Sequence, residues 1–387
     1  MSMEAFEYQL PTKIVFGVGR YAETGALCAA IGKKVLLHYG GGSIKKSGLY
    51  DRVKKSLADA GCSVCELGGV QPNPRLALVR EGIALCKREG VEMILAVGGG
   101  SVIDSAKGIA AGVCYDGDVW DCYTGKAPVA AALPLGVVLT IPAAGSECSD
   151  VSVVTRPDSH DKRSFHAAAV TPRFAIIAPD VFTTLPRNQI ANATVDVISH
   201  VMERFFSDST YVTLTDRFCI ATIETAMQLG LWLYDHPDDL DAWAEFALTA
   251  NIAHNGVLGQ GRIEDWGAHG IGHELSAFYD VAHGASLAIA IPAWMRYAAS
   301  RKPARLVQFA REVMHIYSQD DKQAIEQAVS DFEAFCQRLG LATRLSAAGL
   351  ADADLAAMAK SVVKYRSRGN YISLHEEDCL RIYELAL

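Results

Sequence analysis

Aspartate and histidine side chains with the spacing of metal ligands occur in two stretches of the second half of the chain. Asp196 and His200 are four residues apart in NATVDVISHVMERF, and His269, His273 and His283 follow in HGIGHELSAFYDVAHG. On a helix, a spacing of four places two side chains on one face, one turn apart. Imidazole nitrogens and a carboxylate oxygen suit a divalent ion such as Fe(II) or Zn(II). The pattern predicts a metal site, and because five candidates exceed one tetrahedral shell, one of them must have another role.

A zinc hydrolase is the alternative interpretation of the same residues. His269, His273 and Glu274 resemble a reordered H-E-x-x-H motif. In that motif the glutamate lies inside the histidine pair and faces the metal-bound water, whereas here it follows the pair. A hydrolase also leaves the glycine-rich loops of the first half unexplained. The remaining histidines, His254 among them, are interpreted as structural or surface residues.

The first half contains a strand followed by a glycine turn and a helix, VGGGSVID at residues 97–104. Glycines let the backbone approach a phosphate, and the start of the helix offers free N–H groups. An acid in the first helical turn suits the helix dipole or reaches a ligand hydroxyl. The residues that we expect to contact a cofactor here are Gly98, Gly99, Gly100, Ser101 and Asp104.

A second glycine turn, YGGGSIKKSG at residues 39–48, ends an earlier strand. In nucleotide-binding sheets an acid at such a strand end holds the 2′-hydroxyl of the adenosine ribose and selects NAD. The tip of this turn consists of small residues and a hydroxyl, namely Gly40, Gly41, Gly42 and Ser43. With Lys45 and Lys46 close by and no carboxylate, the turn favours NADPH over NADH.

Two further loops deserve comparison with these turns. FGVGRYAE, residues 16–23, contains G-x-G-x-x-A, but the acid expected about 20 residues later is missing, so we interpret it as a turn into the first helix. TIPAAGSE, residues 140–147, follows an apolar strand and is expected to line the same ligand site, because sheet ligands lie at the carboxyl ends of strands.

The elements that must position these residues fall into two groups. Apolar strands alternate with helices up to about residue 185, which predicts an α/β domain with a parallel, Rossmann-like sheet. The strand candidates are 33–40, 92–98, 136–142 and 174–179. Beyond residue 185 apolar residues recur at helical spacing. The helix candidates there are 188–207, 211–234, 240–258, 265–279, 303–317, 322–339 and 351–366. We therefore predict an α/β domain at 1–185 and an all-α metal-binding domain at 186–387.

Length and composition restrict the class of protein. A chain of 387 residues is long enough for two domains. The net charge of −8, without a basic block, argues against a nucleic-acid partner. No stretch resembles a membrane span or a secretory signal. Ten cysteines, with Cys62 and Cys65 as a lone C-x-x-C, indicate free thiols and predict a cytoplasmic protein.

The motifs together resemble those of the iron-containing (group III) alcohol dehydrogenases, in particular their NADPH-dependent butanol dehydrogenase and aldehyde reductase branch. The resemblance covers nearly the whole chain. The motifs that carry it are YGGGSIKKSG, GGVQPNP, AVGGGSVID, LTIPAAGSE, DVISHVMERF and HGIGHELSAFYDVAHGASLAIAIP. It implies a dinucleotide-binding domain followed by a helical domain, with the cofactor and the metal meeting between them.

The resemblance also implies roles for single residues. The implied metal ligands are Asp196, His200, His269 and His283, which leaves His273 near the nicotinamide and substrate as a candidate for proton transfer. The implied cofactor contacts beyond the glycine turns are Asn73, Thr140, Ser146 and Lys162. Gly41 stands where relatives that prefer NAD carry an aspartate, in agreement with the preference for NADPH.

The expected activity is hydride transfer between NADPH and a small aliphatic aldehyde or primary alcohol such as butanal or butanol, with a homodimer as the assembly. A metal- and NAD-dependent lyase similar to dehydroquinate synthase is the alternative. Its phosphorylated substrate would need clustered cations near the metal, and the sequence offers mainly Arg204 and Arg262.

Overall fold

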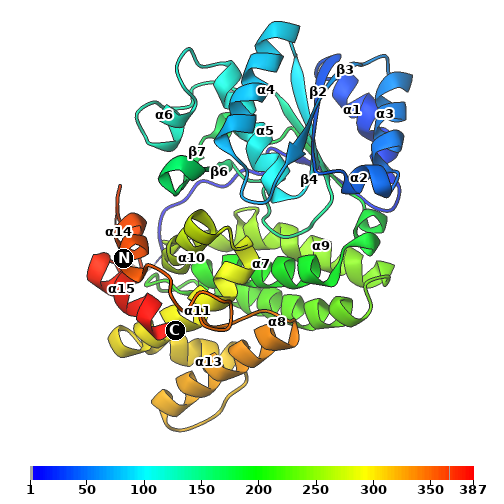
Figure 1. The fold of residues 1–387 in the computed structure, drawn as a ribbon. Coiled ribbons are helices and arrows are strands. Elements are labelled where there is room, and N and C mark those ends of the chain that lie inside the picture. Colours follow the sequence, from blue (N-terminus) through cyan, green and yellow to red (C-terminus); the bar gives the residue numbers. More distant parts are fainter. Residues whose placement is uncertain (1–2, 366) are drawn as a thin grey trace. The chain divides into compact units, whose positions relative to one another are not determined.

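The computed structural model describes residues 3–365 and 367–387, which form two compact units. One unit, the sheet unit, consists of residues 9–185 and 237–251. The other, the helical unit, consists of residues 1–8, 186–236 and 252–387. Figure 1 shows the course of the chain through both units.

The sheet unit is built on six parallel strands with helices on both faces. In spatial order the strands are β1 (Lys13–Phe16), β8 (Phe174–Ile177), β5 (Leu135–Leu139), β4 (Met93–Gly98), β2 (Lys34–Gly40) and β3 (Ser63–Val70). The covering helices are α1 (Thr24–Ala29), α3 (Leu49–Asp59), α4 (Leu76–Glu89) and α5 (Gly100–Val113). In Figure 1, α4 and α5 lie on one side of the sheet and α1 and α3 on the other. The predicted α/β class with a parallel, Rossmann-like sheet is confirmed.

Burial on both faces explains why the central strands are continuously apolar. Residues 35–39 of β2 and all of β4 and β5 are buried. Alternate residues of these strands pack against Cys28 of α1 and against Leu49, Val53 and Leu57 of α3. Such runs are typical of parallel sheets that are covered by helices on both faces.

The strand order places a topological switch point between β2 and β4. From β2 the chain continues to β3 on one side, and then returns to β4 on the other side of β2. In open parallel sheets, ligands bind at the carboxyl ends of strands at such a point. The turns after β2 and β4, which the sequence analysis singled out, both begin there.

A two-stranded antiparallel hairpin adds to the sheet unit and was not predicted. Its strands are β6 (Val151–Arg156) and β7 (Asp161–His166), and Thr155 pairs with Lys162 in the register. The short helices α2 (Ser43–Lys46) and α6 (Trp120–Tyr123) complete the unit, together with the first part of α9 (Leu240–His254).

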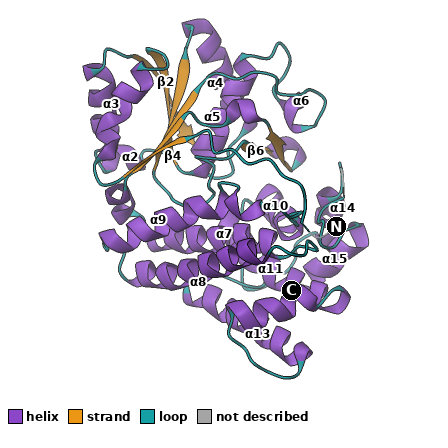
Figure 2. Cartoon of the chain, turned by 180° about the vertical axis from the view of Figure 1, so that it is seen from behind, coloured by secondary structure: helices purple, strands orange, loops and turns teal. Residues whose placement is uncertain are grey.

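The helical unit has no β-strand among its described residues, as predicted for the second half of the chain. Its helices are α7 (Arg187–Phe205), α8 (Thr213–Asp235), α10 (Gly267–Tyr279), α11 (His283–Arg301), α12 (Ala304–Gln308), α13 (Asp321–Arg338), α14 (Leu355–Val362) and α15 (Glu376–Leu385). Figure 2 shows these helices from behind. The helix predicted at 303–317 is instead α12 followed by a π-helix, Phe309–Val313, and α11 was missed altogether.

The two units are not divided by a single boundary at residues 185/186, because one segment from each side of this boundary belongs to the other unit. Residues 3–8 join the helical unit, where Glu4 N–H donates to Gly261 O at 3.0 Å. Residues 237–251 join the sheet unit, where the Trp243 ring lies 5.8 Å from the Phe182 ring and Asn251 donates to Glu147. Tertiary packing rather than chain continuity decides both placements.

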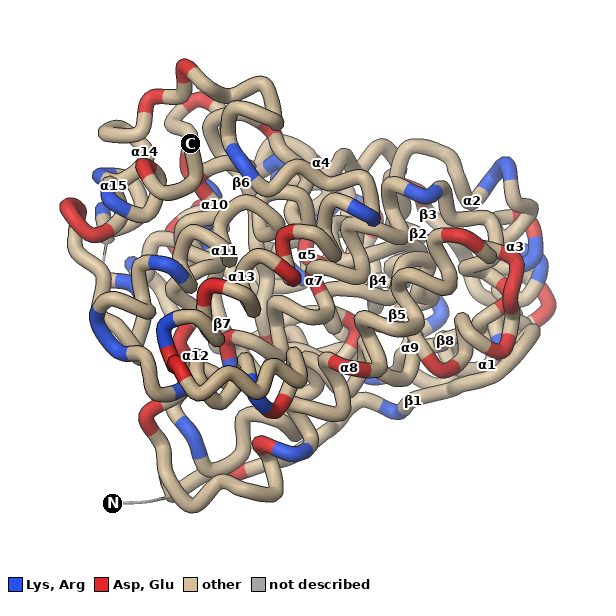
Figure 3. Tube along the Cα trace, turned by 90° about the horizontal axis from the view of Figure 1, so that it is seen from below, with Lys and Arg blue, Asp and Glu red and all other residues tan. Residues whose placement is uncertain are grey.

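Hydropathy and charge vary along the described part of the chain. None of its helices combines the length and the hydropathy that a membrane span requires. Lys and Arg alternate with Asp and Glu along the trace in Figure 3, without a long run of one sign.

Candidate functional site

Three of the predicted metal ligands converge in the helical unit. Asp196 and His200 lie on α7 and His269 lies on α10, and all three are buried. Each offers one ligand atom, and these atoms lie within 4.8 Å of one another. The i,i+4 spacing on α7 therefore does what the sequence predicts, since both side chains face α10 from one side of the helix.

The ring orientation of His200 is set by its own helix. Its Nδ1 lies 2.8 Å from the carbonyl oxygen of Asp196. Because a carbonyl oxygen only accepts hydrogen bonds, Nδ1 carries the proton and Nε2 keeps its lone pair. Burial, with His269 and Arg204 as further causes, lowers the pKa of His200 well below its usual value, so the ring is neutral. A neutral imidazole with a fixed tautomer is the form that binds a metal ion.

Glu203 orients His269, and it was not singled out in the sequence. The His269 backbone N–H donates to Glu203 Oε1 at 2.8 Å, and His269 Nδ1 donates to the same oxygen at 2.7 Å. The carboxylate therefore fixes the ring with Nε2 directed away from Glu203, as in the carboxylate–histidine–metal arrangements of metalloproteins. Burial raises the pKa of Glu203 to about 7. The signal was present in the sequence, because Glu203 lies three residues after His200 on the same helix.

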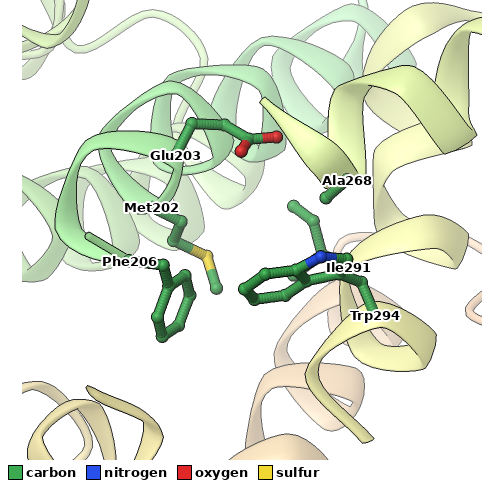
Figure 4. A pocket seen from close by; sticks show the side chains of 6 residues that line it. All are labelled: Met202, Glu203, Phe206, Ala268, Ile291 and Trp294. Carbon is green, nitrogen blue, oxygen red and sulfur yellow. The ribbon is translucent and has the colours of Figure 1, made fainter. Parts of the chain in front are cut away.

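A small cavity lies on the other side of Glu203 (Figure 4). Its walls come from α7, α10 and α11. The lining residues are Met202, Glu203, Phe206, Ala268, Ile291 and Trp294. Figure 4 shows the Glu203 carboxylate pointing toward the helix that carries Ala268, and away from the apolar side chains of Met202 and Phe206. The carboxylate thus has α10 on one side and a mostly apolar wall on the other, which explains the burial that raises its pKa.

His283, the fourth implied ligand, lies at the edge of this cluster. Its Nε2 is 3.6 Å from Asp196 Oδ1, and its ring is 5.3 Å from the ring of His269. His283 is the first residue of α11, and the following glycine brings that helix against α7. A Cβ added at Gly284 would lie 2.1 Å from the carbonyl oxygen of Asn192. Only glycine permits this approach, which places His283 beside Asp196.

Two further histidines, His273 and His254, lie close to the cluster of Asp196, His200 and His269. His273 is half-buried, with its ring 5.3 Å from His283 and 6.3 Å from His269. It is near the ligands without belonging to the group of Asp196, His200 and His269. His254, which the sequence analysis interpreted as a structural or surface residue, is partly buried, and its ring lies 4.3 Å from that of His200. His254 is distant from His200 in sequence, and only the fold of the helical unit, to which both residues belong, reveals the contact.

The geometry disfavours both alternative chemistries. The hydrolase interpretation needs His269 and His273 as the ligand pair, whereas the ligand atoms that converge belong to Asp196, His200 and His269. The lyase needs cations that are available to a phosphate. Arg204 instead donates to His200 O and contacts Glu264, and Arg262 donates to Arg204 O and contacts Asp216.

The three glycine- and hydroxyl-bearing loops of the sheet unit start on adjacent strands. Tyr39 of β2 pairs with Val97 of β4, and Gly98 of β4 pairs with Leu139 of β5. Thr140 N–H donates to Gly98 O at 3.1 Å. The turns at 40–43 and 98–101 and the loop at 140–147 therefore lie side by side at the carboxyl edge of the sheet, as expected.

The glycines of the central turn are required by close packing. A Cβ at Gly98 would lie 2.4 Å from Val102, and Cβ atoms at Gly99 and Gly100 would lie 3.0 Å from Ile141 and Ala144. At the neighbouring turn, a Cβ at Gly41 would meet nothing within 4 Å. The turn after β4 thus has room only for backbone, whereas the tip after β2 is open.

Asp104 has a different environment from the one that the sequence suggested. Its Oδ1 accepts from the Ser146 hydroxyl at 2.6 Å, and its Oδ2 accepts from the Val153 N–H at 3.1 Å. Both oxygens are engaged by the protein, and burial raises the pKa of this carboxyl. Lys107, which the sequence analysis missed, lies one turn later and is completely buried.

Asn73 and Lys162, which are 89 positions apart, are brought together. Lys162 Nζ donates to Asn73 Oδ1 at 3.0 Å, and both residues are buried. Asn73 has a positive φ of 53° in the turn after β3. The G-x-G-x-x-A motif at residues 17–22 lies elsewhere in the sheet unit. It follows edge strand β1, and Gly19 N–H donates to Asp180. That turn is remote from the switch point in the strand order.

Two family descriptions match the chain in sequence. "Iron-containing alcohol dehydrogenase" matches residues 11–179, and "Fe-containing alcohol dehydrogenase family, C-terminal" matches residues 190–387. Together they span nearly the whole of both units.

Relatives and solved structures agree with these matches. The chain is 39% identical to "Probable NADH-dependent butanol dehydrogenase 1" of Bacillus subtilis, with 100% of both chains covered. It is 35% identical to the "NADPH-dependent aldehyde reductase YqhD" of Escherichia coli over 99% of this chain and 100% of that one. The crystal structure of an NADH-dependent butanol dehydrogenase A from Thermotoga maritima superimposes with a TM-score of 0.96 at 40% identity, covering 100% of this chain and 99% of that chain.

Proposed function

The chain belongs to the iron-containing alcohol dehydrogenase family, and from this premise we propose that it reduces small aliphatic aldehydes with NADPH. It is a metal-dependent alcohol dehydrogenase and aldehyde reductase that uses a nicotinamide cofactor. The choice of cofactor, the metal, the substrate and the roles of single residues are our proposals.

The observation that carries the proposal is the convergence of Asp196, His200 and His269, with ligand atoms within 4.8 Å of one another. We propose that these three residues and His283 hold one divalent ion, Fe(II) in keeping with the family, with Zn(II) as the alternative. Nitrogen and carboxylate donors fit either ion. The fit is supported by the ring orientations, because the Nδ1 atoms of His200 and His269 are both engaged by protein oxygens.

The residues around the ion would divide the remaining work. The bound ion supplies Lewis acidity toward the substrate oxygen, and the nicotinamide supplies or accepts the hydride. We propose that His273 exchanges a proton with the substrate oxygen through a ring nitrogen, and its position beside His269 and His283 supports this role. Glu203 holds His269 in place, and the buried surroundings of Asp196 and His200 exclude water from the ligands.

The preference for NADPH is supported by the chemistry of the turn after β2. Residues 40–46 carry a serine hydroxyl and two lysines and no carboxylate. The nearby acid, Glu66, already accepts from Lys54 Nζ at 2.7 Å and from the Tyr50 hydroxyl at 2.7 Å. Lys45 Nζ lies 5.0 Å from the centre of the Tyr39 ring. A 2′-phosphate would therefore meet a cation and hydrogen-bond donors here, and no unpaired acid.

The cofactor contacts that we propose lie along one edge of the sheet unit. They are Gly40, Gly41, Gly42, Ser43, Asn73, Gly98, Gly99, Gly100, Ser101, Thr140, Ser146 and Lys162. Asp104 is kept among them as a residue that shapes the site through Ser146. The aldehyde and primary alcohol class follows from the names of the relatives, and butanal is the first substrate to assay.

The His200→Ala variant tests the proposal directly. It should no longer bind one metal ion per chain and should no longer reduce butanal. It should still bind NADPH, because the proposed NADPH contacts belong to the sheet unit. NADPH binding and metal content are measured separately, by calorimetry and by elemental analysis. A variant that keeps its metal and its turnover would contradict the assignment of His200 as a ligand.

We further propose a homodimer in a reducing, cytoplasmic environment. All ten cysteines are free thiols, which is the form expected in a reducing compartment. The oligomeric state is checked by light scattering coupled to size-exclusion chromatography, where a mass near 41.6 kDa would indicate a monomer instead.

A further inference from the structure

Buried polar side chains on α5 connect this helix to two segments that carry proposed cofactor contacts, the loop after β5 and strand β2. Apolar packing would suffice to cover a sheet, yet the first two turns of α5 bear Asp104, Ser105 and Lys107. Asp104 and Lys107 are both bonded to the loop that contains Ser146, and Ser105 is bonded to His38 of β2. Buried polar groups of this kind are costly unless satisfied, and once satisfied they fix one arrangement of their partners.

Lys107 holds the loop between β5 and β6. Its side chain is completely buried, and its Nζ lies within 2.7–3.2 Å of four acceptors in one short segment. These acceptors are Ser146 O, Ser146 Oγ, Ser149 Oγ and Val151 O. An ammonium group has three N–H donors, so all of them are used. A single side chain thereby fixes the path of residues 146–151.

Asp104 holds the same loop from one turn earlier on the helix. Its two oxygens accept from the Ser146 hydroxyl and from the N–H of Val153. The Ser152 hydroxyl donates to the Asp104 carbonyl oxygen at 2.8 Å. Ser146, a proposed cofactor contact, is thus bonded to both Asp104 and Lys107, and its hydroxyl has its direction fixed by the pair.

A separate contact connects α5 to the strand that ends at the adenosine side. His38 is buried on β2, two residues before the glycine tip. Its Nε2 lies 2.9 Å from Ser105 Oγ, and its Nδ1 lies 2.8 Å from Leu67 O on β3. This contact does not involve Lys107, so the two ends of the nucleotide site have separate attachments to α5.

We propose that Lys107 is a positioning residue for the cofactor, which acts by holding the 146–151 loop and with it Ser146 at the carboxyl end of β5. The proposal rests on the proposed function, since it assumes that a nicotinamide nucleotide binds along this edge. It assigns Lys107 to the side of the site that is formed by the loop after β5. The adenosine side, formed by the tip after β2, should not depend on it.

The Lys107→Met variant tests the proposal, because methionine keeps most of the side-chain volume and removes all donors. Isothermal titration calorimetry should show the Kd for NADPH rising by about tenfold or more, as expected when hydrogen bonds to a charged group are lost. The Kd for 2′,5′-ADP, which carries only the adenosine side, should change by less than about twofold. In steady-state assays the KM for NADPH should rise while kcat at saturating NADPH stays within about threefold of that of the native enzyme.

Two further variants keep the test interpretable if Lys107→Met folds poorly. Ser149→Ala removes one of the four acceptors at a partly exposed position and should raise the Kd for NADPH by about twofold to threefold. Lys87→Met is the matched control, because Lys87 is an exposed lysine of the same unit that donates to Tyr115 O. It should leave both Kd values unchanged, and all three variants should keep their metal.

The outcomes separate this inference from the proposed function. Equal losses of affinity for NADPH and 2′,5′-ADP in Lys107→Met would mean a general structural role and would overturn the proposal. Unchanged affinity for NADPH in a folded Lys107→Met protein would overturn it as well. If the native protein bound neither nucleotide, the proposed function itself would be contradicted.

Discussion

Glu203→Ala is the perturbation from which we expect the most informative change in metal binding. One carboxylate oxygen accepts both the backbone N–H and the ring Nδ1–H of His269, at 2.8 and 2.7 Å. Removing it leaves two buried donors unsatisfied and lets the imidazole ring turn. Loss of such an outer partner weakens metal binding by about 10–100-fold, or about 1.4–2.8 kcal/mol. Glu203→Gln, which keeps an acceptor oxygen but loses the charge, should fall between Ala and the native protein.

The assay is metal affinity, measured by competition with a chromogenic chelator, with the melting temperature of the metal-free protein recorded in parallel. Glu333→Gln is the matched control, since Glu333 is a buried acid of the same unit that pairs with Arg296 and Arg344. It should lower the melting temperature and leave the metal Kd unchanged. A folded Glu203→Ala protein that binds metal as tightly as the native chain would refute the orienting role of Glu203.

Three other changes have definite expected outcomes. Gly41→Asp should lower the ratio of kcat/KM for NADPH to that for NADH by at least about tenfold, because a Cβ there has open space and a carboxylate repels the 2′-phosphate; an unchanged ratio would place the phosphate elsewhere. Gly284→Ala should lower the free energy of unfolding by about 1–3 kcal/mol and weaken metal binding, since its Cβ would lie 2.1 Å from Asn192 O. Denaturant unfolding and chelator competition measure the two effects, and native-like values in both would count against the close approach of α11 and α7. Burial lowers the pKa of His38 to about 4, from 6.5 in the unfolded chain. Below pH 6.5 the unfolded state therefore binds a proton that the fold excludes, and stability falls between about pH 6.5 and 4 by up to about 3 kcal/mol; this loss should be smaller in His38→Asn, and urea unfolding of both proteins at pH 7 and pH 5 checks the difference.

Local patterns in the sequence were sufficient for the four inner strands of the sheet and for most of the helices, but not for β3 or for the hairpin of β6 and β7. The apolar runs at β2, β4, β5 and β8 are buried on both faces, so composition alone reveals them. Periodicity revealed α8 and α13, which each bury one side more than the other. Helix α7 was also predicted, although residues 193–205 are buried on all sides. The α/β class and the change to helices near residue 185 follow from these features.

Helix α11 shows where such patterns stop being informative. It is buried on nearly all sides in its middle turns, so apolar residues show no period, and Pro292 lies inside it. Proline usually ends or kinks a helix. Tertiary packing overrides that preference here, and no local signal in the sequence could have shown it.

The site divides in the same way between local and non-local information. The pairs Asp196/His200 and His269/His273 are helical neighbours, so their spacing is visible in the sequence. Glu203, three residues after His200, could have been found by continuing the same helical face of α7. His254 beside His200 and Lys107 beside Ser146 depend on contacts between elements that are distant in sequence. Only the packing of the elements brings these pairs together.

The most direct test of the account is the oxidation of NADPH by butanal, followed at the nicotinamide absorbance band before and after chelation and after return of Fe(II) or Zn(II). We predict rapid oxidation that is lost on chelation, restored by the metal, and faster with NADPH than with NADH. Turnover that survives complete removal of the metal would contradict the assignment. So would a metal-loaded protein that turns over no aldehyde of a panel with either cofactor.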